Sequence, residues 1–251
     1  MIWVDSFLIA FSLYTIIPVP QREWDSANMG YALAFLPAAG AAVALLSWAV
    51  CGLSSAIGMG DMVRAALAAA APIFFTGGIH LDGFMDTVDA LSSHGSIEKK
   101  LAILKDPHVG AFAVAGCSLY LLLYMAASYE TGMKAMLLMI PGAALSRSLS
   151  GLSAVTLRSA RKGGMLDTLV SSSDRQLLTI ILSVTGAFSA ITLILMGRLC
   201  GIAAVLAALL FFMFFRRIAV REFGGMTGDL AGFFIQTSEL LMLLCMAAFL
   251  K

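Results

Sequence analysis

Long apolar stretches recur along the whole chain, and they constrain the fold more than any other feature of the sequence. A membrane-spanning helix needs about 20 apolar residues, because the hydrocarbon core offers no water to backbone amide and carbonyl groups. Hydrophobic residues make up 60% of the 251 residues and charged residues only 12%. Soluble domains have about 45–50% and about 25%, respectively. The sequence therefore predicts an all-α, polytopic integral membrane helix bundle.

Eight apolar stretches divide a single predicted domain, residues 1–251, into about seven or eight membrane helices. They are Trp3–Ile17, Gly30–Ile57, Met62–Ile79, Val109–Tyr129, Met133–Thr156, Leu177–Gly197, Leu199–Phe215 and Leu230–Leu250. The first is short for a span and is followed by Pro18 and Pro20, which leaves both a crossing and a re-entrant or interfacial path open. Little more than Arg198 separates the sixth stretch from the seventh, which predicts a tight helical hairpin.

Basic residues are unevenly distributed between alternate loops. Eleven of the 16 Lys and Arg residues lie between the first two stretches, at 80–108, at 157–175 and at 216–229. An alternating in–out path places these segments on one side, and the positive-inside rule identifies that side as cytoplasmic. We expect a multi-pass protein of the inner (cytoplasmic) cell membrane with its site facing the cytoplasm. The net charge of +1 excludes the basic face that a nucleic acid partner requires.

Three aspartates follow the third stretch at helical spacing. Asp82, Asp86 and Asp89 stand at i, i+4 and i+7, within about 60° of one helix face. Aligned carboxylates near a membrane repel each other and need a cation, and their hard oxygens suit Mg²⁺. A solvated acidic helix start is the alternative, but it does not require three carboxylates on one face. His80 is a candidate catalytic residue or a simple hydrogen-bonding partner.

Arginines in and beyond the fifth stretch could bind phosphate. Arg147 lies within the stretch, and Arg158 and Arg161 lie just after it. Guanidinium groups match phosphate oxygens through paired hydrogen bonds. The alternative for Arg147 is an ion pair with Glu239 in the last stretch. The alternative for the other two is that their charges only set the topology.

Two further motifs lie on the expected cytoplasmic side. Lys105 could bind phosphate and Asp106 could act on a hydroxyl, and an interfacial lysine with a helix cap is the alternative. Gly224 and Gly225 precede the last stretch, where bare backbone at a helix N-terminus favours an anion and Asp229 could complete a metal site. A tight turn with an aspartate cap is the alternative there. Carboxylates and cations on one side of the membrane together predict metal-assisted transfer of a phosphoryl group.

Four blocks of the sequence resemble the cobalamin synthase family, the adenosylcobinamide-GDP ribazoletransferases. In chain order they are Tyr14–Pro20, Thr76–Leu91, Leu104–Phe112 and Gly224–Asp229. The resemblance implies a Mg²⁺-dependent membrane transferase that joins adenosylcobinamide-GDP to α-ribazole or its 5′-phosphate and releases GMP. The product would be adenosylcobalamin or its 5′-phosphate, late in cobalamin biosynthesis. Ala90 departs from the glycine common in that family and affects no expected ligand.

The residue patterns and the resemblance define one expected site. The expected Mg²⁺ ligands are Asp82, Asp86, Asp89 and Asp229. The expected substrate and phosphate contacts are Lys105, Arg147, Arg158, Arg161, Gly224 and Gly225, and Asp106 and His80 are the catalytic candidates that would position or deprotonate the ribose hydroxyl. A CDP-alcohol phosphatidyltransferase is the alternative enzyme, although the arginine of its Asp-Gly-x-x-Ala-Arg pattern is missing here. A membrane transporter is the non-enzymatic alternative, and the sequence does not fix whether the chain forms a homo-oligomer.

Overall fold

The computed structural model describes residues 2–22 and 29–250, and the regular elements in these ranges are all helices. In chain order they are α1 (Ile2–Tyr14), η1 (Ala32–Phe35), α3 (Leu36–Ala56), α4 (Asp61–Phe75), α5 (Ile79–Ser92), α6 (Ile97–Ile103), α7 (Ala111–Thr156), α8 (Met165–Ser171), α9 (Arg175–Gly197), α10 (Leu199–Phe223) and α11 (Gly228–Phe249). An isolated β-bridge pairs Ser159 with Met226. The predicted all-α class is confirmed.

Five of these helical segments are long and apolar enough to cross a membrane: η1 with α3, α7, α9, α10 and α11. Helices α4 and α5 meet at a 95° bend and together would make a sixth candidate. Helix α4 is the apolar member of this pair. Helix α5 follows it after the bend and contains the three aspartates. Gly132, with φ 62° and ψ −155°, breaks α7 into two helices, and dividing α7 there adds one more span. Within the described ranges, this count is compatible with the predicted seven or eight.

Several helix boundaries differ from the expected ones. Helix α10 continues to Phe223, whereas the expected stretch ends at Phe215. The last turns of the helix therefore carry the basic residues that the sequence analysis assigned to a loop. The expected hairpin is confirmed, since Arg198 alone joins α9 to α10, with φ 52° and ψ −121°. The 13 residues of α1 reach only about 20 Å, less than the roughly 30 Å of a bilayer core.

The second half of α7 occupies the centre of the bundle, where it packs against α3, α9 and α11. Small residues allow these close contacts: a Cβ atom on Gly186 of α9 would lie 3.2 Å from Cβ of Ser148 on α7. The outer faces of α9 and α10 instead expose large apolar side chains, including Phe188 at 71% and Leu195 at 74%. Such faces are stable against lipid and costly in water, which supports the membrane assignment.

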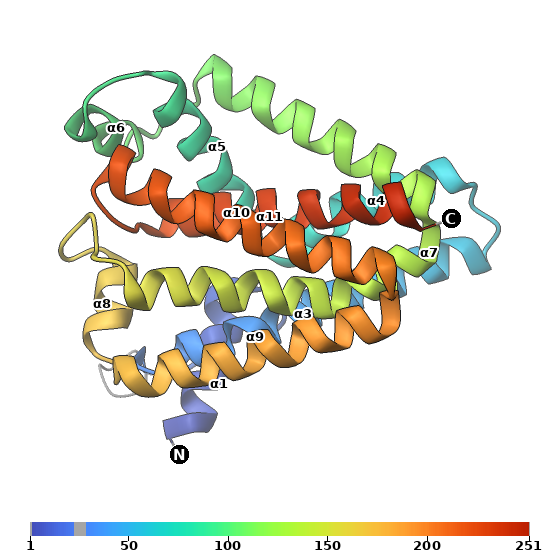
Figure 1. Ribbon diagram of the computed structural model, residues 1–251, viewed down its shortest axis with the longest axis horizontal. Coiled ribbons are helices and arrows are strands. Elements are labelled where there is room, and N and C mark those ends of the chain that lie inside the picture. Colours follow the sequence, from blue (N-terminus) through green and yellow to red (C-terminus); the bar gives the residue numbers. More distant parts are fainter. Residues whose placement is uncertain (1, 23–28, 251) are drawn as a thin grey trace.

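The polar connections gather at one end of the bundle. Figure 1 shows α6, α8 and the loop that leads from α10 to α11 together at the left, while the α3–α4 connection and the C-terminus lie at the right. The segments with the excess of basic residues therefore share one end, as the alternating path required. The acidic helix α5 begins in the middle of the bundle and runs toward the same end.

Candidate active site

The backbones of helices α5 and α11 approach each other closely at two glycines, and this contact brings the acidic residues together. A Cβ atom on Gly83 of α5 would lie 2.7 Å from the carbonyl oxygen of Asp229. A Cβ atom on Gly232 of α11 would lie 2.7 Å from the carbonyl oxygen of His80. Because neither position has room for a side chain, Asp229 in the first turn of α11 is brought beside the aspartates of α5.

The four aspartates form one electrostatic cluster. Burial is the largest cause that raises the pKa of Asp86 to about 6, and the negative charges of Asp82, Asp229 and Asp89 raise it as well. A carboxyl group whose ionisation is opposed by neighbouring carboxylates is stabilised in its charged form by a cation. The cluster therefore has the charge and the hard oxygen donors that a divalent cation such as Mg²⁺ binds.

Asp89 has a further partner, which is the start of α7. Its Oδ2 accepts a hydrogen bond from the Gly110 N–H at 2.7 Å, and its Oδ1 accepts one from the Ala113 N–H at 2.8 Å. A carboxylate in this position satisfies free amide groups of the first turn and interacts favourably with the helix dipole. The structure thus gives Asp89 a capping role, which makes it a weaker metal-ligand candidate than Asp82, Asp86 and Asp229.

The acidic cluster is not a closed metal cage. Among residues 2–22 and 29–250, no group of three or more His, Cys, Asp or Glu side chains converges enough to hold a metal ion on its own. Mg²⁺ in phosphoryl-transfer sites commonly binds one or two carboxylates and completes its shell with water and substrate phosphates. The carboxylates accordingly fit a metal that is shared with a substrate, and do not fit a permanent structural site.

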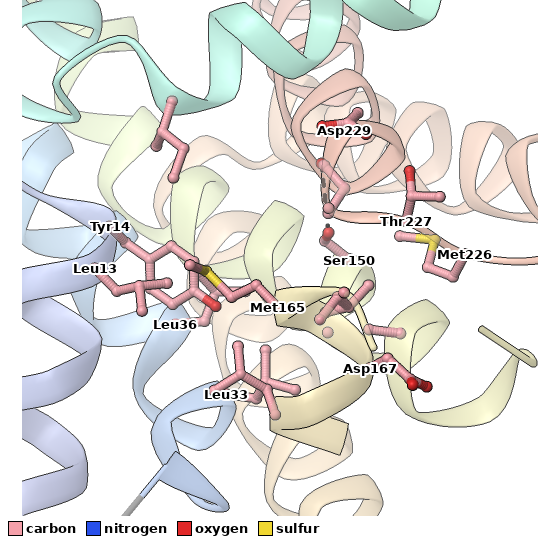
Figure 2. Close-up of a pocket in the computed structure, with 18 of the residues that line it drawn as sticks. Leu13, Tyr14, Leu33, Leu36, Ser150, Met165, Asp167, Met226, Thr227 and Asp229 are labelled. Atoms are coloured by element: carbon pink, nitrogen blue, oxygen red, sulfur yellow. Dashed lines mark hydrogen bonds between the residues drawn. The ribbon is translucent and has the colours of Figure 1, made fainter. Parts of the chain in front are cut away.

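A cavity of about 240 Å³ lies beside the cluster. Its polar wall includes Asp82 and Asp229, together with His80, Thr227 and Arg161. Its opposite wall is built by α1, η1, α3 and α8 and is mostly apolar, although α8 also contributes Asp167. Figure 2 shows the two walls, with the apolar side chains of α1 and α3 on one side and the start of α11 on the other.

Arg161 brings a positive charge to this cavity. Its Nε and Nη2 atoms are buried and have no hydrogen-bond partner in the part of the chain that the structure describes. Buried donors without partners cost free energy, and the cost is larger when the donor is charged. The side chain lines the cavity, so an anion bound there is a candidate partner for these atoms. This placement is compatible with the phosphate contact expected of Arg161.

The segment that carries Arg161 is fixed to the start of α11 by backbone hydrogen bonds. Met226 N–H donates to the Arg158 carbonyl at 2.8 Å, and Ala160 N–H donates to the Met226 carbonyl at 3.0 Å. A Cβ atom on Gly225 would lie 2.3 Å from the Arg158 carbonyl oxygen, and Gly224 has φ 74°. Gly225 therefore packs directly against the backbone of the chain, and the phosphate contact expected of Gly224 and Gly225 stays a prediction. Arg158 is exposed, does not line the cavity, and donates from Nε to the Gly224 carbonyl.

Arg147 is buried in the centre of the bundle and does not line this cavity. Its guanidinium forms an ion pair with Glu239 and donates to Ser146 Oγ at 3.2 Å. Ser146 in turn donates to Glu239 Oε1 at 2.8 Å. Removing either charge would leave the other buried and unpaired. The structure corrects the phosphate-binding prediction for Arg147 and supports the ion-pair alternative.

Lys105 and Asp106 lie in an exposed turn before α7 and do not line the cavity. Asp106 Oδ1 accepts a hydrogen bond from the His108 N–H at 3.0 Å and pairs with its ring Nδ1 at 2.6 Å. These contacts with His108 lower the pKa of Asp106, so its carboxylate is a weak base. Neither residue is therefore at the cavity that Asp82 and Asp229 line, and the roles expected of Lys105 and Asp106 stay predictions.

His80 is buried near the N-terminus of α5 and lines the cavity with Asp82. Its ring stacks against that of Tyr14 at a centroid distance of 6.2 Å. The side chain is withdrawn from water, and burial disfavours the charged imidazolium. The imidazole is therefore neutral, and it suits a hydrogen bond to a substrate better than proton abstraction.

Sequence reasoning missed several cavity residues. Tyr14, Ser150, Met165 and Thr227 all line the cavity, and the Thr227 hydroxyl caps α11. Tyr14 and Thr227 belong to two of the blocks that carried the family resemblance, so a signal for them existed. No sequence signal marks Ser150 or Met165, because the polarity and spacing of their segments are those of any membrane helix or loop.

Comparisons with known proteins agree along the whole chain. The family model described as cobalamin-5-phosphate synthase matches residues 6–247. A relative from Lachnoclostridium phytofermentans named adenosylcobinamide-GDP ribazoletransferase is 37% identical over 241 residues, which cover 96% of this chain and 92% of the relative. Relatives of the same name from Brevibacillus brevis and Clostridium perfringens are 33% and 30% identical, over 96% and 95% of this chain and 97% and 95% of their own. No solved structure matches the chain.

Proposed function

The chain belongs to the cobalamin-5-phosphate synthase family and is a transferase of cobalamin synthesis, and from this premise we propose its full reaction. Adenosylcobinamide-GDP is joined to α-ribazole or its 5′-phosphate, which forms adenosylcobalamin or its 5′-phosphate. A ribose hydroxyl attacks the phosphorus that carries the cobinamide. A new P–O bond forms, the P–O bond to GMP breaks, and the hydroxyl proton leaves on a phosphate oxygen of the departing GMP.

One observation carries the proposal, namely the two kinds of charge that face a single cavity. Asp82 and Asp229 supply carboxylate oxygens, and Arg161 supplies two buried nitrogen atoms without partners in the described chain. Phosphoryl transfer depends mainly on positioning and on neutralising charge at the phosphate oxygens. A diphosphate fits between these groups, because it can share a cation with the carboxylates and accept hydrogen bonds from the guanidinium.

Mg²⁺ is the proposed cofactor, and Asp82, Asp86 and Asp229 are its candidate ligands, of which one or two would bind the ion directly and the others through water. When bound, it supplies charge neutralisation at the diphosphate and at the departing GMP. The protein's own side chains do the remaining work. Arg161 holds phosphate oxygens, His80 positions the attacking hydroxyl as a neutral hydrogen-bond partner, and the apolar wall excludes water from the reacting groups.

The proposed location is the inner cell membrane, with the cavity facing the cytoplasm. Several residues between positions 159 and 169 line the cavity, and this range belongs to one of the segments rich in basic residues. The positive-inside rule assigns such segments to the cytoplasmic side. Water-soluble substrates such as a nucleotide-linked corrinoid would then reach the site without crossing the bilayer.

The test is an assay of the purified protein in lipid nanodiscs. The proposal expects GMP release only when adenosylcobinamide-GDP, α-ribazole and Mg²⁺ are all present, and none after EDTA treatment. CMP release from a CDP-alcohol, or flux of a corrinoid or cation without any product, would overturn it. Turnover that persists in EDTA would remove Mg²⁺ from the proposal.

A matched pair of variants tests the metal assignment in the same assay. Asp86→Asn removes one proposed ligand and should abolish Mg²⁺-dependent turnover. Asp61→Asn makes the same chemical change at the start of α4, where the carboxylate forms a surface ion pair with Arg64, and should retain turnover. Equal activity of the two variants would contradict the assignment.

A further inference from the structure

The cavity has an apolar lobe that the phosphate chemistry does not use. Four separate elements build this lobe, and its residues are Leu13, Tyr14, Leu33, Leu36, Met165 and Leu169. Figure 2 shows Leu13, Tyr14 and Leu36 on the side of the cavity opposite Thr227 and Asp229. One cavity thus joins an apolar compartment to a charged one. Such a cavity fits a ligand that has one apolar part and one charged part.

Tyr14 gives the lobe its one hydrogen-bonding side chain. Its ring lies against His80, with the ring centroids 6.2 Å apart. Its hydroxyl has no hydrogen-bond partner among residues 2–22 and 29–250. The lobe therefore offers a flat apolar ligand extensive contact and a single hydrogen bond.

We propose that this lobe binds the base of the nucleoside substrate and that the Tyr14 hydroxyl donates a hydrogen bond to the free ring nitrogen of that base. The inference rests on the proposed function. The base of α-ribazole is 5,6-dimethylbenzimidazole, a flat, mostly apolar bicycle with one ring nitrogen left as an acceptor. One donor in an otherwise apolar lobe matches one acceptor on an otherwise apolar base.

The other substrate fits this lobe poorly. Guanine presents several donors and acceptors at its edges, and all but one would lose their partners in such surroundings. With the benzimidazole in the lobe, the ribose lies between it and the wall formed by His80, Asp82 and Asp229. That arrangement directs a ribose hydroxyl toward the diphosphate, as the proposed reaction requires.

The hydrogen bond is tested with Tyr14→Phe, which removes only the hydroxyl. The KM for α-ribazole should rise by about five- to tenfold, while the KM for adenosylcobinamide-GDP stays the same. Tyr129→Phe, at an exposed tyrosine of α7 outside the cavity, is the control and should change neither KM. With the α-riboside of 5,6-dimethylindole, which lacks the acceptor nitrogen, Tyr14→Phe should have no effect. An equal effect on both ribosides would overturn the hydrogen bond.

The apolar contact is tested by filling the lobe with Met165→Trp. Met165 is 54% exposed, so the fold tolerates a larger side chain there. The KM for α-ribazole should rise at least about tenfold, without change in the KM for adenosylcobinamide-GDP. Met62→Trp, at an exposed methionine of α4 outside the cavity, is the control. A rise confined to the KM for adenosylcobinamide-GDP would place that substrate in the lobe and overturn the inference.

Direct binding separates failure of this inference from failure of the proposed function. Equilibrium dialysis of α-ribazole against the protein in nanodiscs needs no turnover. If the unmodified protein releases no GMP, the proposed function fails, and weaker α-ribazole binding by Tyr14→Phe and Met165→Trp still supports the base subsite. Binding equal to that of the unmodified protein in both variants would overturn the subsite even if GMP is released.

Discussion

Replacing Gly83 by alanine tests whether the α5–α11 crossing positions the acidic cluster. The added Cβ would lie 2.7 Å from the carbonyl oxygen and 2.8 Å from Cα of Asp229, whereas ordinary contact begins near 3.4 Å. Both neighbours are backbone atoms, so the helices must separate by about 0.7 Å to relieve the overlap. Overpacking of this kind costs about 1–3 kcal/mol, and an active-site displacement of 1 Å can reduce the rate by about 100-fold.

The expected result for Gly83→Ala is a fall in kcat/KM of about tenfold to 100-fold, together with a lower thermal unfolding temperature. GMP release in nanodiscs and thermal unfolding measure the two effects. Gly52→Ala is the control, because the nearest heavy atom to its Cβ would be Cε of Met133 at 3.5 Å. If the two variants have the same activity and stability, the crossing does not set the geometry of the cluster.

Three further perturbations test other parts of the account. Arg161→Ala should raise the KM for adenosylcobinamide-GDP by about tenfold to 100-fold without lowering the unfolding temperature, since it removes donors that have no partner in the described chain; an unchanged KM would contradict the phosphate contact. Glu239→Gln should destabilise the protein by about 3–5 kcal/mol, because Arg147 would be left buried and unpaired, and calorimetry that shows no loss would refute the ion pair. The pKa of Asp86 is raised from 3.8 to about 6, so the folded protein binds this proton more tightly than the unfolded chain and, without Mg²⁺, its stability should fall as pH rises from about 4 to 6. In Asp86→Asn the unfolding temperature should no longer show this fall with pH. If the variant and the unmodified protein show the same dependence of unfolding temperature on pH, Asp86 does not cause the fall.

Local patterns in the sequence predicted the helices and the spacing of the aspartates. Apolar length determines where a chain can enter a bilayer, so the spans were predictable without tertiary information. Asp82, Asp86 and Asp89 share one face because helix geometry alone relates residues four and seven apart. Their meeting with Asp229 follows from the contact at Gly83 and Gly232, which no local pattern reveals.

The roles of individual charged residues were less predictable, because each depends on partners far away in sequence. Arg147 and Arg161 have the same chemistry, yet Arg147 pairs with Glu239 while two nitrogen atoms of Arg161 have no partner in the described chain. Asp89 caps a helix that begins about twenty residues later. Sequence reasoning therefore predicted which residue types could form a site, and the structure was required to separate the residues that line the cavity from those with structural partners.

The central claim is that the carboxylates of α5 and Asp229 hold a divalent cation against a diphosphate. Anomalous diffraction from crystals grown in lipid with Mn²⁺ and a nucleoside diphosphate locates the ion directly, because Mn²⁺ accepts the same oxygen ligands as Mg²⁺. The account predicts a peak between Asp82, Asp86 and Asp229, with phosphate oxygens completing the coordination. A peak elsewhere, or these carboxylates directed away from a bound diphosphate, would contradict it.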